Sequence, residues 1–137
     1  MEQNTIALVQ DSFEKVKPIA DTAAKIFYEK LFKLDPSLKS IFPKSDEAMA
    51  AQGNKLMTML GSAVAGLNNL EMLVPVLENL GKRHVDYKVE PSHYHTVGSA
   101  LLSTLETGLG DEFTPDVKDA WAKVYGTMSS VMIDASY

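Results

Sequence analysis

Apolar residues recur every three or four positions along nearly the whole sequence, and sustained alternation of apolar and polar residues is hard to find. This spacing matches the 3.6-residue turn of an α-helix, whereas strands repeat every two residues. One such face is formed by Ile6, Val9, Phe13 and Val16. The periodicity predicts an all-α protein, and at 137 residues we expect one domain over residues 1–137.

Prolines and glycines divide this pattern into separate helices. Pro18 and Pro91 can each begin a helix, because proline is tolerated in the first turn. A long helix is expected from about residue 45 to 66. Pro75 is expected to interrupt the next helix, so that residues 77–84 form a short separate one. Together the breaks predict about seven helices.

Composition narrows the classes of function. Eighteen acidic residues against 13 basic ones give a net charge of -5, which disfavours binding to nucleic acid or anionic membranes. Cysteine is absent, which excludes disulfides, thiolate metal sites and iron-sulfur clusters. No basic and apolar leader precedes the first helix, and no apolar run approaches the ~18 residues of a membrane span. We therefore expect a cytoplasmic protein.

The three histidines are the first candidates for chemistry. His84 shares an apolar helical face with Leu77 and Leu80, where a neutral imidazole needs a hydrogen-bond partner or a metal ion. The spacing alone leaves both alternatives open. His93 and His95 are two residues apart and so point about 200° away from each other on a helix. They cannot chelate one ion from that helix, and we expect both to be exposed to solvent.

Motifs of side-chain catalysis are missing. The histidines and Glu90 do not have the spacing of a helical zinc motif such as His-Glu-x-x-His. Neither a Gly-x-Ser-x-Gly elbow nor a Gly-x-x-x-x-Gly-Lys phosphate loop occurs. We therefore assign no catalytic residue.

Six separated runs, in one fixed order, carry a family resemblance. They are residues 27–32 (FYEKLF), 38–42 (LKSIF), Gln52 with Leu56, 80–84 (LGKRH), 93–98 (HYHTVG) and 120–126 (AWAKVYG). Together they resemble the globin family, specifically the bacterial single-domain haemoglobins and the globin module of flavohaemoglobins. The resemblance covers residues 5–133 and implies a globin fold packed around one haem b.

The resemblance implies a role for individual residues around the haem. His84 matches the proximal iron ligand, and its other nitrogen would need an acceptor such as the Leu80 carbonyl. Phe42 matches the phenylalanine that stacks on the haem, and Leu56 the apolar residue above the iron. Val97 is assigned to the cofactor pocket on the same basis.

Tyr28 and Gln52 match the distal pair of the family. A phenol O–H and an amide N–H can donate to the outer oxygen of O₂, which predicts high O₂ affinity. On position alone, Lys55, Arg83 and Lys44 are candidates for pairing with the haem propionates.

One position departs from the family pattern. Tyr94 matches a proximal tyrosine that, in flavohaemoglobins, joins a glutamate near the end of the globin module. The place of that glutamate is taken here by Ser136, and the nearest acid, Asp134, lies off the required face. The resemblance therefore implies weaker electron donation by His84 and disfavours peroxidase-like chemistry.

Reversible binding of O₂, with CO and NO as further small ligands, is the function we expect. The alternative is conversion of NO and O₂ to nitrate, which needs a reductant; 137 residues leave no room for the fused reductase of flavohaemoglobins, so a separate reductase would have to serve. A gas sensor is less favoured, because such globins usually carry an output domain.

Overall fold

The computed structural model describes residues 2–42, 45–86 and 89–137, and within these ranges it contains six α-helices and no strand. The helices are α1 (Gln3–Val16), α2 (Ala20–Leu34), α3 (Asp46–Ala65), α4 (Leu70–Asp86), α5 (Pro91–Leu109) and α6 (Pro115–Ser136). Four short 3₁₀ segments join them: Lys17–Ile19, Pro36–Ile41, Gly66–Asn68 and Gly110–Glu112. The prediction of an all-α fold is confirmed.

Local side-chain contacts explain where several helices begin and end. Ser45 accepts a hydrogen bond from the Ala48 N–H at the start of α3, and Thr114 accepts one from the Val117 N–H at the start of α6. Such caps satisfy backbone donors that have no partner within the helix. After α5 the chain turns at Gly110, whose φ of 58° is one that glycine adopts without steric cost.

The predicted break at Pro75 is wrong, because α4 runs through this residue from Leu70 to Asp86. A proline inside a helix removes the hydrogen bond to the carbonyl four residues earlier, which here belongs to Glu71. Glu71 and Pro75 are both exposed, so water can reach that carbonyl. The helix therefore continues, and six helices replace the expected seven.

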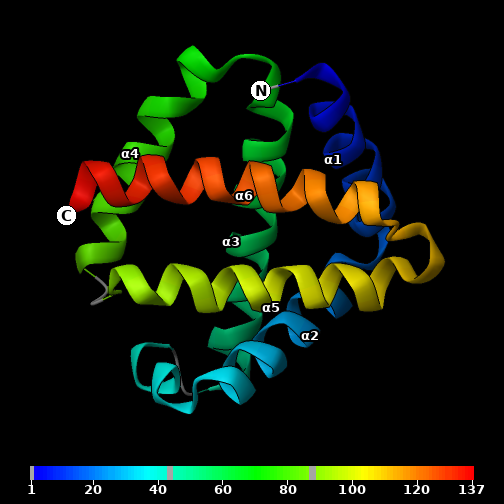
Figure 1. Cartoon of the computed structure of the whole chain (residues 1–137). Helices are drawn as coiled ribbons and strands as arrows, with labels where there is room; N and C mark the ends of the chain where they lie inside the picture. Colours follow the sequence, from blue (N-terminus) through cyan, green and yellow to red (C-terminus); the bar gives the residue numbers. More distant parts are fainter. Residues whose placement is uncertain (1, 43–44, 87–88) are drawn as a thin grey trace.

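The helices pack in two crossing layers (Figure 1). α5 and α6 lie side by side in front and run in opposite directions, and α3 crosses behind them. α4 packs against α6 near the C-terminus, and α1 packs against the first half of α6. α2 contacts both α3 and α5. None of the helices in the described residues is long and apolar enough to cross a membrane.

The contact between α1 and α6 forms one part of the apolar core. All four residues of the predicted N-terminal face, Ile6, Val9, Phe13 and Val16, are buried. Trp121 is fully buried, and its indole N–H donates to the Ser12 hydroxyl at 2.8 Å. The hydrogen bond offsets the cost of burying the indole N–H. The first and last helices are therefore joined both by apolar packing and by a hydrogen bond.

The contact between α4 and α6 is closest at Gly81. A Cβ atom on this residue would lie 2.5 Å from the Met132 carbonyl oxygen and 2.7 Å from the Ser136 hydroxyl. No real Cβ atom approaches a backbone atom so closely, so only glycine permits this distance between the helices. His84 lies three residues after Gly81 on α4, within one turn of this contact.

Gly81→Ala should destabilise the protein. We expect the free energy of unfolding in urea to fall by about 1 to 3 kcal/mol, because the helices must separate to admit the methyl group. Gly126→Ala on α6 is the matched control, since an added Cβ there meets no atom within 4 Å. That variant should be neutral or more stable by up to about 1 kcal/mol. Equal stability of the two variants would contradict the close contact at Gly81.

Candidate cofactor site

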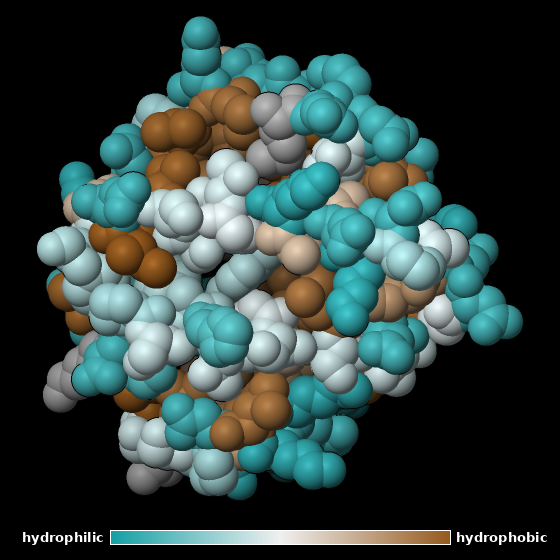
Figure 2. Space-filling model, viewed as in Figure 1, coloured by the Kyte–Doolittle hydropathy of each residue, from teal (hydrophilic) through white to brown (hydrophobic). Residues whose placement is uncertain are grey.

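An apolar cavity of about 200 Å³ is lined by α2, the segment that follows it, and α3 to α6. Its walls are built mainly from leucine, methionine and aromatic side chains, and its polar lining residues are Ser62, His84, His93, Tyr94, Tyr125 and Ser129. The space-filling view in Figure 2 shows the surface hollowed between α5 and α6, two of the helices that line the cavity. Val76 also lines it and is 47% exposed, so the cavity reaches the surface.

His84 lies half-buried on the α4 wall of this cavity. Its ring meets the ring of Tyr94 edge-on, with 5.9 Å between the ring centroids. Burial lowers the pKa of His84 below the ordinary value of histidine, while interaction with the Leu80 backbone acts in the opposite direction. A lowered pKa favours the neutral imidazole at neutral pH, and a neutral imidazole has a lone pair available for a metal ion.

Four other residues expected around the cofactor, Phe42, Leu56, Tyr94 and Val97, line the same cavity. They come from the segment after α2, from α3 and from α5. The structure thus brings residues from three separate sequence runs together around one cavity, which His84 also lines.

Two of the three expected propionate partners are surface residues that do not line the cavity. Lys55 and Arg83 are exposed, and neither lines the cavity. Lys44 falls outside the described residues. Position along the sequence was the only basis for these three assignments, and it does not determine which way a long side chain on a helix surface extends.

Tyr28 and Gln52 lie together but outside the cavity lining. The Tyr28 hydroxyl donates to the backbone carbonyl of Gln52 over a long 3.5 Å, and the Tyr28 ring packs edge-on against Phe42 with 5.4 Å between centroids. Burial raises the pKa of Tyr28 to about 12, and a hydrogen bond with Gln52 opposes this shift. Tyr28 is therefore a protonated donor at neutral pH, and its ring touches the cavity lining at Phe42.

The other side of Tyr28 faces a polar groove of about 970 Å³ between α2 and α3. Three lysines and three acidic residues line this groove: Lys25, Lys33, Lys39, Asp21, Glu29 and Asp46. Tyr28 thus stands in a wall with charged groups on one side and the aromatic lining of the cavity on the other.

Two further hydroxyls are buried, one on Tyr94, whose ring meets that of His84, and one on Ser136, near Gly81. Neither hydroxyl oxygen has a hydrogen-bond partner among the described residues. Burial raises the pKa of Tyr94 to about 12, with a smaller contribution from Tyr137. Asp134 is exposed. The Tyr94 group beside His84 is therefore a neutral hydroxyl at neutral pH.

The expectation that His93 is exposed is wrong, whereas His95 is exposed as expected. His93 lines the cavity, and its side chain is only 17% exposed. The sequence did contain a signal for this: His93 is the third residue of α5, and side chains at that position can bend back to accept from the N–H of the residue before the helix. His93 does so with Glu90.

The donors in this cavity fit a haem rather than a bare metal ion. Among the described residues no three His, Asp or Glu side chains come together as a metal site requires, so the single imidazole of His84 suits a metal whose other ligands come with the cofactor. The volume of about 200 Å³ is below the roughly 300 to 1,000 Å³ of pockets for drug-sized ligands. A haem must therefore also fill the mouth and separate the walls.

Comparison with known proteins agrees with the fold. The family model described as Globin matches residues 25–132. The chain is 29% identical over 133 residues to a flavohemoprotein of Bacillus subtilis and 28% identical over 133 residues to one of Rhodopirellula baltica. Each match covers 97% of this chain and 33% of the relative, so the chain spans about a third of the length of these relatives. With the matched region extending over most of its length, the chain belongs to the globin family.

Proposed function

We propose that this globin holds haem b through His84 and binds O₂ reversibly, with CO and NO as alternative ligands. The observation that carries the proposal is the half-buried imidazole of His84 on the wall of an apolar cavity that reaches the surface. When bound, haem supplies an iron atom that takes up diatomic gases. The remaining requirements are met by the side chains of the protein.

His84 supplies the nitrogen lone pair, and the apolar walls keep water away. The lowered pKa keeps the imidazole neutral and therefore able to bind a metal. Phe42 and Leu56 are apolar lining residues from two different segments. A water-poor pocket favours a neutral gas over charged or strongly hydrated competitors.

Tyr28 and Gln52 supply hydrogen-bond donors for the gas. At 3.5 Å the contact between the Tyr28 hydroxyl and the Gln52 carbonyl is at the outer limit of a hydrogen bond, so little free energy is lost when the hydroxyl turns away. The Tyr28 ring already touches the cavity lining at Phe42. If the Tyr28 side chain turned toward the cavity, its hydroxyl could donate to the outer oxygen of O₂. That oxygen accepts hydrogen bonds well because it carries partial negative charge.

A neutral group beside His84 favours ligand binding over oxidative chemistry. A carboxylate hydrogen-bonded to a proximal imidazole makes it a stronger electron donor and assists O–O bond cleavage. Here the ring beside His84 belongs to Tyr94, whose hydroxyl is buried and neutral, and Asp134 is exposed. This arrangement supports a binding protein more than a peroxidase-like enzyme.

Conversion of NO and O₂ to nitrate is the second candidate. The matched relatives are called flavohemoproteins, a name that combines flavin and haem. About two thirds of their length lies outside the match. A reductase acting on this globin would have to supply an electron in each cycle.

His84→Ala should abolish tight retention of haem, because it removes the nitrogen that would bind the iron. Wild-type protein mixed with hemin should develop an intense Soret band that survives gel filtration, and His84→Ala should lose most of it. His95→Ala, which alters an exposed histidine, should retain the band. A wild-type protein that stays colourless with hemin would refute the proposal.

Tyr28→Phe should speed the release of O₂. One net hydrogen bond to a ligand with partial charge contributes about 1.5 kcal/mol, so the dissociation rate constant measured by stopped flow should rise about tenfold. Tyr137→Phe is the control, because Tyr137 lies outside the cavity lining and is 53% exposed. Equal rates for wild type and Tyr28→Phe would remove Tyr28 from the distal role.

A turnover assay separates the two candidate functions. The O₂ complex of most globins oxidises NO once, so a single turnover carries no information. With a cellular reductase and NADH present, the binding function predicts at most about one nitrate per haem in the presence of excess NO. Many nitrates per haem at a steady rate would instead establish the dioxygenase function.

A further inference from the structure

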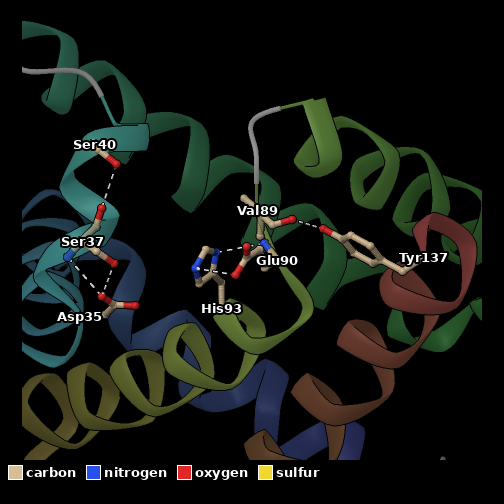
Figure 3. Close-up of polar contacts among 7 residues, drawn as sticks. All are labelled: Asp35, Ser37, Ser40, Val89, Glu90, His93 and Tyr137. Carbon is tan, nitrogen blue, oxygen red and sulfur yellow. Dashed lines mark hydrogen bonds and ion pairs between the residues drawn. The ribbon is translucent and has the colours of Figure 1, made fainter.

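His93 is a polar residue at the boundary between the cavity and solvent. It is the third residue of α5, it lines the cavity together with His84, and its side chain is 17% exposed. Figure 3 shows its ring beside Glu90 at the start of the helix. The ring therefore touches both the apolar interior and the surface.

One hydrogen bond at the start of α5 orients this ring. The Glu90 N–H donates to His93 Nδ1 at 3.0 Å, while the backbone N–H of His93 donates to the Glu90 carbonyl at 2.9 Å and closes the first turn. Because Nδ1 accepts a hydrogen bond, the neutral ring carries its proton on Nε2. His93 therefore presents an N–H donor from Nε2.

Among the described residues, no group accepts a hydrogen bond from that donor. The nearest acidic oxygen, Glu90 Oε2, lies 4.0 Å from Nε2, which is too far for a hydrogen bond. The Glu90 side chain is 73% exposed, so water screens its charge. An anion beside Nε2 would accept a hydrogen bond that no group in the described residues accepts.

The rest of the described lining offers no comparable partner for an anion. It contains no lysine or arginine, and the expected partners Lys55 and Arg83 are exposed residues outside it. Among the remaining polar lining residues, the Tyr125 hydroxyl already donates to the Tyr94 carbonyl at 2.6 Å. His84 is assigned to the iron in the proposed function.

We propose that His93 binds a propionate carboxylate of the haem through Nε2–H at the mouth of the cavity. This inference rests on the proposed function. Haem carries two carboxylates on one edge, and that edge must face solvent because burying a charged carboxylate is costly. His93 therefore presents an oriented N–H at the boundary with solvent, where such a carboxylate must lie.

The test compares His93→Gln with His93→Glu. Both side chains can accept the Glu90 N–H as residues at this position of a capping box do, so α5 keeps its start in either variant. Gln retains an N–H donor, whereas Glu replaces it with a negative charge. We expect hemin to be lost about tenfold faster from His93→Glu, and within about threefold of the wild-type rate from His93→Gln.

The readout is transfer of hemin to an excess of a haem-scavenging apoprotein, followed by absorbance. Each protein is loaded either with hemin or with hemin dimethyl ester, which lacks the carboxylates. The faster loss from His93→Glu should disappear with the ester. His95→Glu adds the same charge two residues away on an exposed site and should behave like wild type with both cofactors.

Glu90→Gln gives a second test that leaves His93 unchanged. Removal of a negative charge near the mouth should slow hemin loss about twofold at low salt, with a smaller effect at high salt. It keeps the proposal testable if His93→Glu does not fold.

Two results would overturn the assignment alone: hemin loss from His93→Glu at the wild-type rate, or an equal acceleration with the dimethyl ester, which would indicate disturbed packing. A wild-type protein that binds neither hemin nor its ester would overturn the proposed function and this assignment together.

Discussion

The contact of α6 with its two neighbours is the constraint on which the cavity depends. Gly81 lets α4 approach the backbone of α6 at Met132, and Gly98 on α5 faces the ring of Tyr125, where a Cβ would lie 2.7 Å away. The hydroxyl of that tyrosine then donates to the Tyr94 carbonyl. Because α6 is held against both helices, the side chains of His84 and Tyr94 meet across the cavity. A shift of α6 would move both walls at once.

Helix positions could be predicted from the sequence because their causes are local. Apolar spacing, a capping serine or threonine and a turn glycine act within a few residues of each other, as at Ser45, Thr114 and Gly110. The predicted break at Pro75 was wrong because the cost of a proline inside a helix depends on whether water can reach the carbonyl that loses its hydrogen bond. That property depends on which face of α4 is exposed, and exposure is decided by the packing of other helices.

The same distinction between local and long-range causes applies to the residues of the candidate site. An apolar helical face together with the family resemblance placed His84, Leu56 and Val97 around one cavity. The Tyr28 hydroxyl meets the carbonyl of Gln52, a residue 24 positions away on another helix, and spacing along the sequence does not reveal that contact. His93 turned inward because of a hydrogen bond to Glu90 that residue spacing allows but does not require. Sequence patterns therefore assign residues to faces, and the orientation of each side chain depends on its neighbours.

The burial of the Ser136 hydroxyl explains why a charged side chain would be costly at this position. The hydroxyl is buried against Gly81, at the closest contact between α4 and α6. A carboxylate in that place would lose its hydration, and the described lining of the cavity contains no lysine or arginine to offset its charge. A small hydroxyl avoids that cost and lets the two helices approach. Under the proposed function, a neutral group at this position favours reversible binding of a gas over oxidative chemistry.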